Sequence, residues 1–372
     1  MTSPQQLVIA SLNVALETCS AALHVTPTVE HHSDSPDLSV LRNDFTSILS
    51  LLHGSTTKLS LALNPASPTY SASLTPLKDI SEQISAVSHC VRLLDHNHGL
   101  SLNQEFTSVA NDVIQSVRSL LQTFLDIETS GNRTSTGKAG DKYMIRIGTV
   151  HEIINNARSG LSKDNLASVQ KKLAQDHDSL EDGLQEVGEM VTDHGSAIES
   201  ADGDGWDDDG WGELGMDSRR RMDSDELERA KKVHAILRLS TLLHKRIMKD
   251  ILSPPPHYPS KLPSTTVQNL DSLPRQSSAL LVASDDLVST LYTPQNPSNV
   301  LTELASFTEV INNLRSTLLL LLQEPTLVEH IEAMTLQGTS VPLKDPKKWF
   351  ESCFVQIQKA MENLESTLNI DR

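Results

Sequence analysis

The stretch Asp202-Gly203-Asp204-Gly205-Trp206-Asp207-Asp208-Asp209-Gly210-Trp211-Gly212-Glu213 decides how the chain is organised. Glycine weakens helices and strands alike, and closely spaced carboxylates repel one another. This segment is therefore predicted to lie outside regular secondary structure. Helical patterns continue for long distances on both sides of it. The sequence thus predicts two helical halves joined by a flexible acidic strap, which we place at residues 199–221.

The remainder of the chain carries a helical pattern of aliphatic residues. Leu, Val, Ile and Ala recur at intervals of three and four, and no alternation typical of strands competes with them. Aromatic residues make up only 3% of the 372 residues, so the cores must be aliphatic. We therefore predict an all-α protein with an N-terminal bundle over residues 1–198 and a C-terminal bundle over residues 222–372.

Start signals delimit several of these helices. Ser3 followed by Pro4 is typical of a helix N-terminus, as is Asp223 followed by Glu226. The first helix is expected to bury a stripe that includes Leu7, Ala10, Val14, Cys19 and Leu23. Ser162 is expected to cap a long helix in which leucine or valine recurs every seven residues, at Leu166, Leu173, Leu180 and Val187. Such a repeat also occurs in leucine zippers, where a second apolar row runs beside the first. Here Asp176 and Gly183 interrupt that second row, which favours a helix in a bundle core.

Composition excludes some classes of partner. The formal net charge of −17 repels phosphate backbones and anionic membrane surfaces, so we expect neither nucleic-acid binding nor stable membrane insertion. No secretory signal is apparent, and the leucine run Leu318 to Leu322 is too short to span a bilayer. Cys19, Cys90 and Cys353 are predicted to be buried thiols. Together these features predict a protein of the cytoplasm and nucleus.

No chemical motif is complete. The loop from Gly131 to Gly140 resembles a phosphate-binding loop, but five residues separate Gly131 from Gly137, and Ala139 stands where a hydroxyl is needed. The strap does not match the ligand spacing of an EF-hand. His151-Glu152 begins a string like that of metalloproteases, but Asn155 replaces the second histidine. We therefore expect no catalytic residue, no metal site and no cofactor.

The tryptophans of the strap are the candidate partner-binding residues. Two large apolar rings in a solvated acidic segment are costly to expose, so a protein partner is one explanation for them, and docking on the chain's own bundle is the other. The candidate set is Trp206, Asp207, Asp208, Asp209 and Trp211.

Several segments resemble the cyclin-D-binding protein family, also known as the cyclin-D-interacting proteins. The longest runs from Asp285 through Leu287, Tyr292 and Pro294, and the final helix opens at a tryptophan, Trp349, as it does in that family. The other similar segments are Leu93-Leu94 with Gly99-Leu100-Ser101-Leu102, Gly148 to Val150, and Asp164-Asn165. The chain departs from the family at His151, where the family tends to have tryptophan.

The resemblance implies an all-helical protein with bundles similar to those of vinculin and α-catenin. It also implies a non-enzymatic protein that binds D-type cyclins or another regulatory protein and restrains cell-cycle progression. An alternative from the architecture alone is an adaptor of the cytoskeleton or of membrane trafficking. A third hypothesis is an enzyme of a class that the sequence does not identify. In its specific form, Lys138 would bind a nucleotide.

Overall fold

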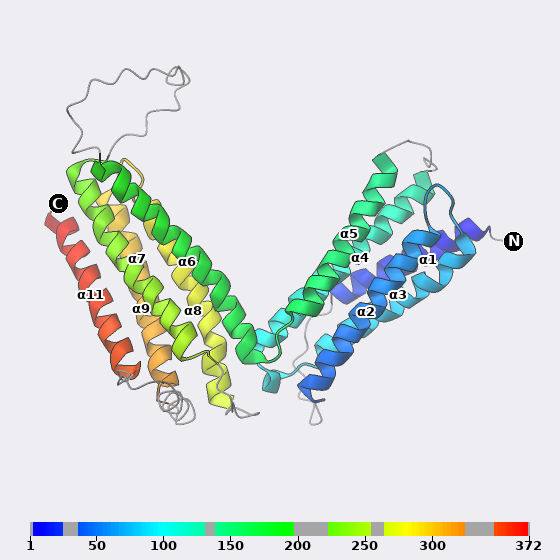
Figure 1. The fold of residues 1–372 in the computed structure, drawn as a ribbon, viewed down its shortest axis with the longest axis horizontal. Helices are drawn as coiled ribbons and strands as arrows, with labels where there is room; N and C mark the ends of the chain where they lie inside the picture. The colour runs from blue at the N-terminus through cyan, green and yellow to red at the C-terminus, as the bar shows by residue number, and fades with distance from the viewer. Residues whose placement is uncertain are drawn as a thin grey trace, which may run out of the picture. The chain divides into compact units, whose positions relative to one another are not determined.

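A computed structural model describes residues 3–24, 36–130, 138–196, 222–253, 264–323 and 346–370. Within these ranges the chain is helical and contains no strand, which confirms the predicted all-α class. The acidic strap and the loop residues 131–137 lie outside them. The helices are α1 (Pro4–Leu23), α2 (Leu38–Ala62), α3 (Tyr70–Arg92), the short η1 (His96–His98), α4 (Leu100–Ser130), α5 (Lys138–Gly160), α6 (Asn165–Ser196), α7 (Ser224–Asp250), α8 (Ser264–Ser289), α9 (Pro297–Leu321) and α11 (Pro346–Ile370) (Figure 1).

Two predicted helix starts are confirmed, and one is wrong. Ser3 accepts a hydrogen bond from the backbone of Gln6 and forms a capping box at α1, and Asp223 does the same with Glu226 at α7. The long helix α6, however, begins at Asn165 rather than near Ser162. Its cap is Asp164, whose carboxylate accepts a hydrogen bond of 2.8 Å from the backbone N–H of Ala167.

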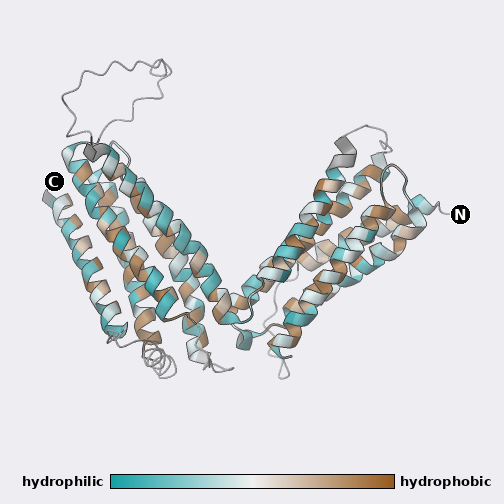
Figure 2. Cartoon of the chain, in the orientation of Figure 1, coloured by the Kyte–Doolittle hydropathy of each residue, from teal (hydrophilic) through white to brown (hydrophobic). Residues whose placement is uncertain are grey.

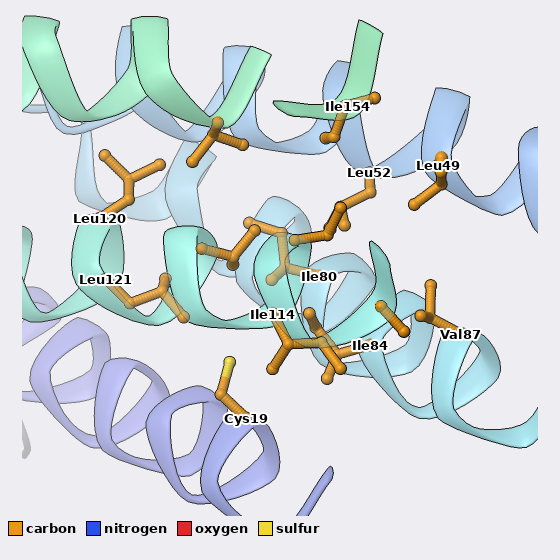
Figure 3. Close-up of a cluster of buried hydrophobic side chains, with 14 of the residues drawn as sticks. Cys19, Leu49, Leu52, Ile80, Ile84, Val87, Ile114, Leu120, Leu121 and Ile154 are labelled. Carbon is orange, nitrogen blue, oxygen red and sulfur yellow. The ribbon is translucent and has the colours of Figure 1, made fainter. Parts of the chain in front are cut away.

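The chain divides into two compact units, of which the first spans Met1–Ser168. In this unit α1 packs against α3 and α4, α2 packs against α3 and α5, and α4 packs against α5. Helix α3 also packs against α4, so each of the five described helices has at least two neighbours, which closes a bundle around one mainly aliphatic core. Figure 3 shows side chains from all five helices meeting there, among them Cys19, Leu52, Ile84, Leu121 and Ile154. Apolar residues recur along each helix, as the periodicity predicted (Figure 2).

Helix α1 buries a face that only partly matches the predicted stripe, because Cys19 and Leu23 face the core but Leu7, Ala10 and Val14 do not. Leu7 and Val14 are 44% and 58% exposed, whereas the core side of the helix is formed by Val8, Leu12, Ala15 and Cys19. Both faces are apolar, since Glu17 is the only charged residue of α1. This composition also makes α1 the one helix, among the residues described, that is long and apolar enough to cross a membrane. In the first unit it serves as a bundle helix.

The second unit spans Val169–Arg372 and also contains five described helices. Helix α7 packs against α8 and α11, and α9 packs against the same two helices. Helix α6 belongs here too, because Asp176 accepts a hydrogen bond from Ser278 of α8 and Glu181 pairs with Lys245 of α7. The division therefore falls just after the first residues of α6, about thirty residues before the boundary at 198 that the sequence suggested.

The seven-residue repeat of α6 is buried, as expected for a bundle core. Leu166, Leu173, Leu180 and Val187 are all buried. Gly183, one of the positions that interrupt the second apolar row, faces α8: a Cβ added there would lie 3.9 Å from a carboxylate oxygen of Asp285. Asp176 and Gly183, which interrupt the second apolar row, thus both face α8. The repeat is therefore part of a bundle core and does not form a leucine zipper.

A glycine fixes the corner between α3 and α4. Gly99 has a φ of +93°, in the left-handed region that side chains disfavour. The side chain of Asn165 lies against it and accepts a hydrogen bond of 3.0 Å from the backbone N–H of Leu102. Asn165 thereby acts as an N-cap for α4 from a distant part of the sequence. A Cβ at Gly99 would lie 2.0 Å from the Asn165 Cγ, so only glycine leaves room for this contact.

Candidate functional site

A polar layer lies inside the second unit where α6, α7 and α8 meet. The rings of His177 and His244 stack with centroids 5.5 Å apart, and the Nε2 of His244 lies 2.7 Å from the Oγ of Ser277. The carboxylate of Glu181 lies 3.2 Å from His177. Burial, reinforced by the neighbouring His177, lowers the pKa of His244 from 6.5 to about 4. His244 is therefore neutral at physiological pH.

The pairing of Ser277 with His244 has the spacing of a nucleophile and its base, but its surroundings do not suit that chemistry. Ser277 is 2% exposed and His244 is 1% exposed, so a substrate cannot reach them. The Nδ1 of His244 has no hydrogen-bond partner among the described residues, so no third group orients the ring. A histidine with a pKa near 4 is also a weak base at neutral pH. The pair serves to connect α7 with α8.

His151, which begins the metalloprotease-like string, lies between helices of the first unit. Its ring stacks on His53 of α2 with centroids 3.8 Å apart, and its Nε2 lies 3.2 Å from the hydroxyl of Thr57. Burial and the adjacent His53 lower the pKa of His151. In the part of the chain that the structure describes, no three His, Cys, Asp or Glu residues are grouped to hold a metal ion. His151 therefore joins α2 to α5.

The three cysteines are buried, as predicted. Burial raises the pKa of Cys19 to about 12 and that of Cys353 to about 11, and it also raises the pKa of Cys90. All three thiols are therefore protonated at neutral pH and poorly reactive.

A groove on the surface of the second unit runs between α9 and α11. It is open to solvent and has a volume of about 690 Å³. Its floor is apolar, with Leu304 and Met361 buried beneath it. Three glutamates and several small polar side chains form the remainder. The lining residues are Leu301, Thr302, Leu304, Ala305, Ser306, Thr308, Glu309, Gln358, Met361, Glu362 and Glu365.

The groove was not predicted from the sequence, and the predicted partner-binding residues are not tested by the structure. Trp206, Asp207, Asp208, Asp209 and Trp211 all lie outside the described residues. The groove combines two helices whose lining residues are some fifty positions apart, and each helix alone shows only an ordinary amphipathic pattern. The weak signal available was the set of glutamates at 309, 362 and 365 beside the apolar stripes.

The fold defines a protein built from two helical bundles. Comparison with protein families makes this assignment specific. The family model described as Grap2 and cyclin-D-interacting, N-terminal, matches residues 44–193, and the corresponding C-terminal model matches residues 204–316. The chain therefore belongs to the Grap2 and cyclin-D-interacting protein family, a family of interaction proteins, which confirms the resemblance. Comparison with curated proteins gave no match.

The two family models meet at the acidic strap, whereas the structural division lies within α6. The N-terminal model extends to residue 193 and so includes nearly all of α6, although that helix belongs to the second unit from Val169 onward. Gly99 and Asn165 lie within the N-terminal model. The segment from Asp285 to Pro294 lies within the C-terminal model. The boundary between the family models therefore lies between residues 193 and 204, whereas the packing boundary lies after Ser168.

Proposed function

We propose that this chain is a non-enzymatic binding protein whose partner is a D-type cyclin, and that through this partner it regulates cell-cycle progression in the cytoplasm and nucleus. The family match over residues 44–193 and 204–316 carries the proposal. The groove between α9 and α11 supports it, because rigid helices with an apolar floor and a charged rim are a common docking surface for protein segments. We further propose that the acidic strap steers the partner through its charge.

Isothermal titration calorimetry with the purified full chain tests this function. We expect a purified D-type cyclin to bind saturably, with a Kd of about 1 μM or tighter, and a cyclin of another class not to bind. A variant that lacks residues 202–217 should remain helical by circular dichroism and bind more weakly, mainly because association slows. Absence of any binding heat with the D-type cyclin at high micromolar concentration would remove the cyclin assignment. Loss of helicity in the deletion variant would instead make the strap structural.

A further inference from the structure

The groove between α9 and α11 has the dimensions of a short peptide segment. Its lining on α9 extends from Leu301 to Glu309, and its lining on α11 extends from Gln358 to Glu365. At 1.5 Å per residue these stretches are roughly 10 to 12 Å long, which is the length of about two turns of a helix. Ala305 contributes only a methyl group near the middle of the lining, so a partner can approach the backbone of α9 closely there.

The floor of the groove is held rigidly by the core. Met361 is 2% exposed, and the hydroxyl of Thr308 lies 3.3 Å from its sulfur, which joins α11 to α9 below the groove. Leu304, on the other side, is also buried. The floor is therefore suited to one or two aliphatic side chains of a partner.

The charges around this floor have one sign. Glu309 extends from α9, and Glu362 and Glu365 extend from α11, whereas no lysine or arginine among the described residues lines the groove. Gln358 donates a hydrogen bond of 3.1 Å to Glu362, which helps to orient that carboxylate. All three glutamates are exposed, so they can pair with cations of a partner at the rim. An acidic peptide or a nucleic acid would be repelled here.

We infer that the groove binds a basic amphipathic helix of a protein partner, with aliphatic side chains on the floor and Lys or Arg side chains against the three glutamates. This inference rests on the proposed binding function and adds the chemistry of the partner. A second copy of this chain does not fit the groove against itself, because a symmetric contact would place carboxylates against carboxylates. In this mode of recognition, the residues at positions i, i+3, i+4 and i+7 of the bound helix contact the groove.

The test uses a designed fluorescein-labelled peptide with Leu at i, i+3, i+4 and i+7 and Lys at the intervening positions. Fluorescence anisotropy with the full chain at physiological salt should show saturable binding. A scrambled peptide of the same composition should bind at least tenfold more weakly, because it lacks an apolar face. Glu362→Lys should raise the Kd about tenfold by replacing attraction with repulsion. Its matched control is Glu351→Lys, an exposed glutamate of the same helix outside the groove, which should leave the Kd within twofold.

A second pair of variants tests the shape of the groove without changing its charge. Ala305→Trp should fill the floor and raise the Kd about tenfold, whereas Ser316→Trp, at an exposed position of α9 outside the groove, should not. Equal Kd values for Glu362→Lys and Glu351→Lys, or for the two tryptophan variants, would overturn the inference. The same variants titrated with the D-type cyclin separate the two proposals. Peptide binding without cyclin binding would leave the groove assigned and remove the cyclin.

Discussion

Lowering the pH from 7 to 4 should reduce the unfolding free energy of the second unit by about 3 kcal/mol through His244 alone. Burial next to His177 lowers the pKa of His244 from 6.5 to about 4. The unfolded chain therefore takes up a proton on this residue below pH 6.5, while the folded chain does not until about pH 4. The stabilisation is complete above pH 6.5 and is lost as the pH falls toward 4.

Comparison with the variant His244→Gln separates the contribution of His244 to the pH dependence of the unfolding free energy from that of the many carboxylates. His244→Gln removes the titrating ring and can still hydrogen-bond Ser277. Urea titrations from pH 7 to pH 4 should show the difference in unfolding free energy between the original chain and this variant shrinking by about 3 kcal/mol. The control His89→Gln changes an exposed histidine of α3. If the curves of the original chain and His244→Gln stay parallel over this range, the buried neutral histidine is not as described.

Replacing Gly99 with alanine should destabilise the first unit by about 2 to 3 kcal/mol. A side chain in the left-handed conformation costs about 1 to 2 kcal/mol. Its Cβ would also displace the Asn165 side chain, and loss of that cap on α4 costs about 1 kcal/mol more. Denaturant unfolding of the full chain, followed by hydrogen exchange at α4, measures both effects.

Gly54 provides the matched control for this substitution. It lies inside α2, and a Cβ added there meets nothing within 4 Å. Gly54→Ala should therefore stabilise the unit by up to about 1 kcal/mol, because alanine is the better helix former. Equal effects of the two substitutions would show that the corner at Gly99 does not have the described geometry.

Two of the three helix caps expected from signals within one helical turn were read correctly from the sequence, whereas α6 is capped by Asp164 and not by Ser162. The caps at Ser3 and Asp223 depend on a residue and its neighbour three positions on, and both are present in the structure. The repeat in α6 was correctly assigned to a bundle core, because Asp176 and Gly183 interrupt any second apolar row. Local chemistry was sufficient in each case.

Local sequence patterns could not predict which helix faces pack against one another. The two faces of α1 are both apolar, so periodicity could not distinguish the buried side, at Leu12, from the exposed side, at Val14. The partner of α6 depends on contacts with α7 and α8, which follow the strap in the sequence. The groove requires α9 and α11 to be neighbours. The capping of α4 by Asn165 joins residues more than sixty positions apart, and no local pattern specifies it.

The assignment of α6 to the second unit, on which the groove-bearing bundle depends, is tested most directly by the folding of two fragments. Leu173, Leu180 and Val187 are buried, and their burial stabilises the unit by roughly 6 kcal/mol, a large part of the stability of a typical domain. Urea unfolding followed by circular dichroism should therefore show a cooperative transition for residues 163–372 and none for residues 222–372. A fragment 222–372 that unfolds cooperatively at the same midpoint as the longer one would contradict the assignment.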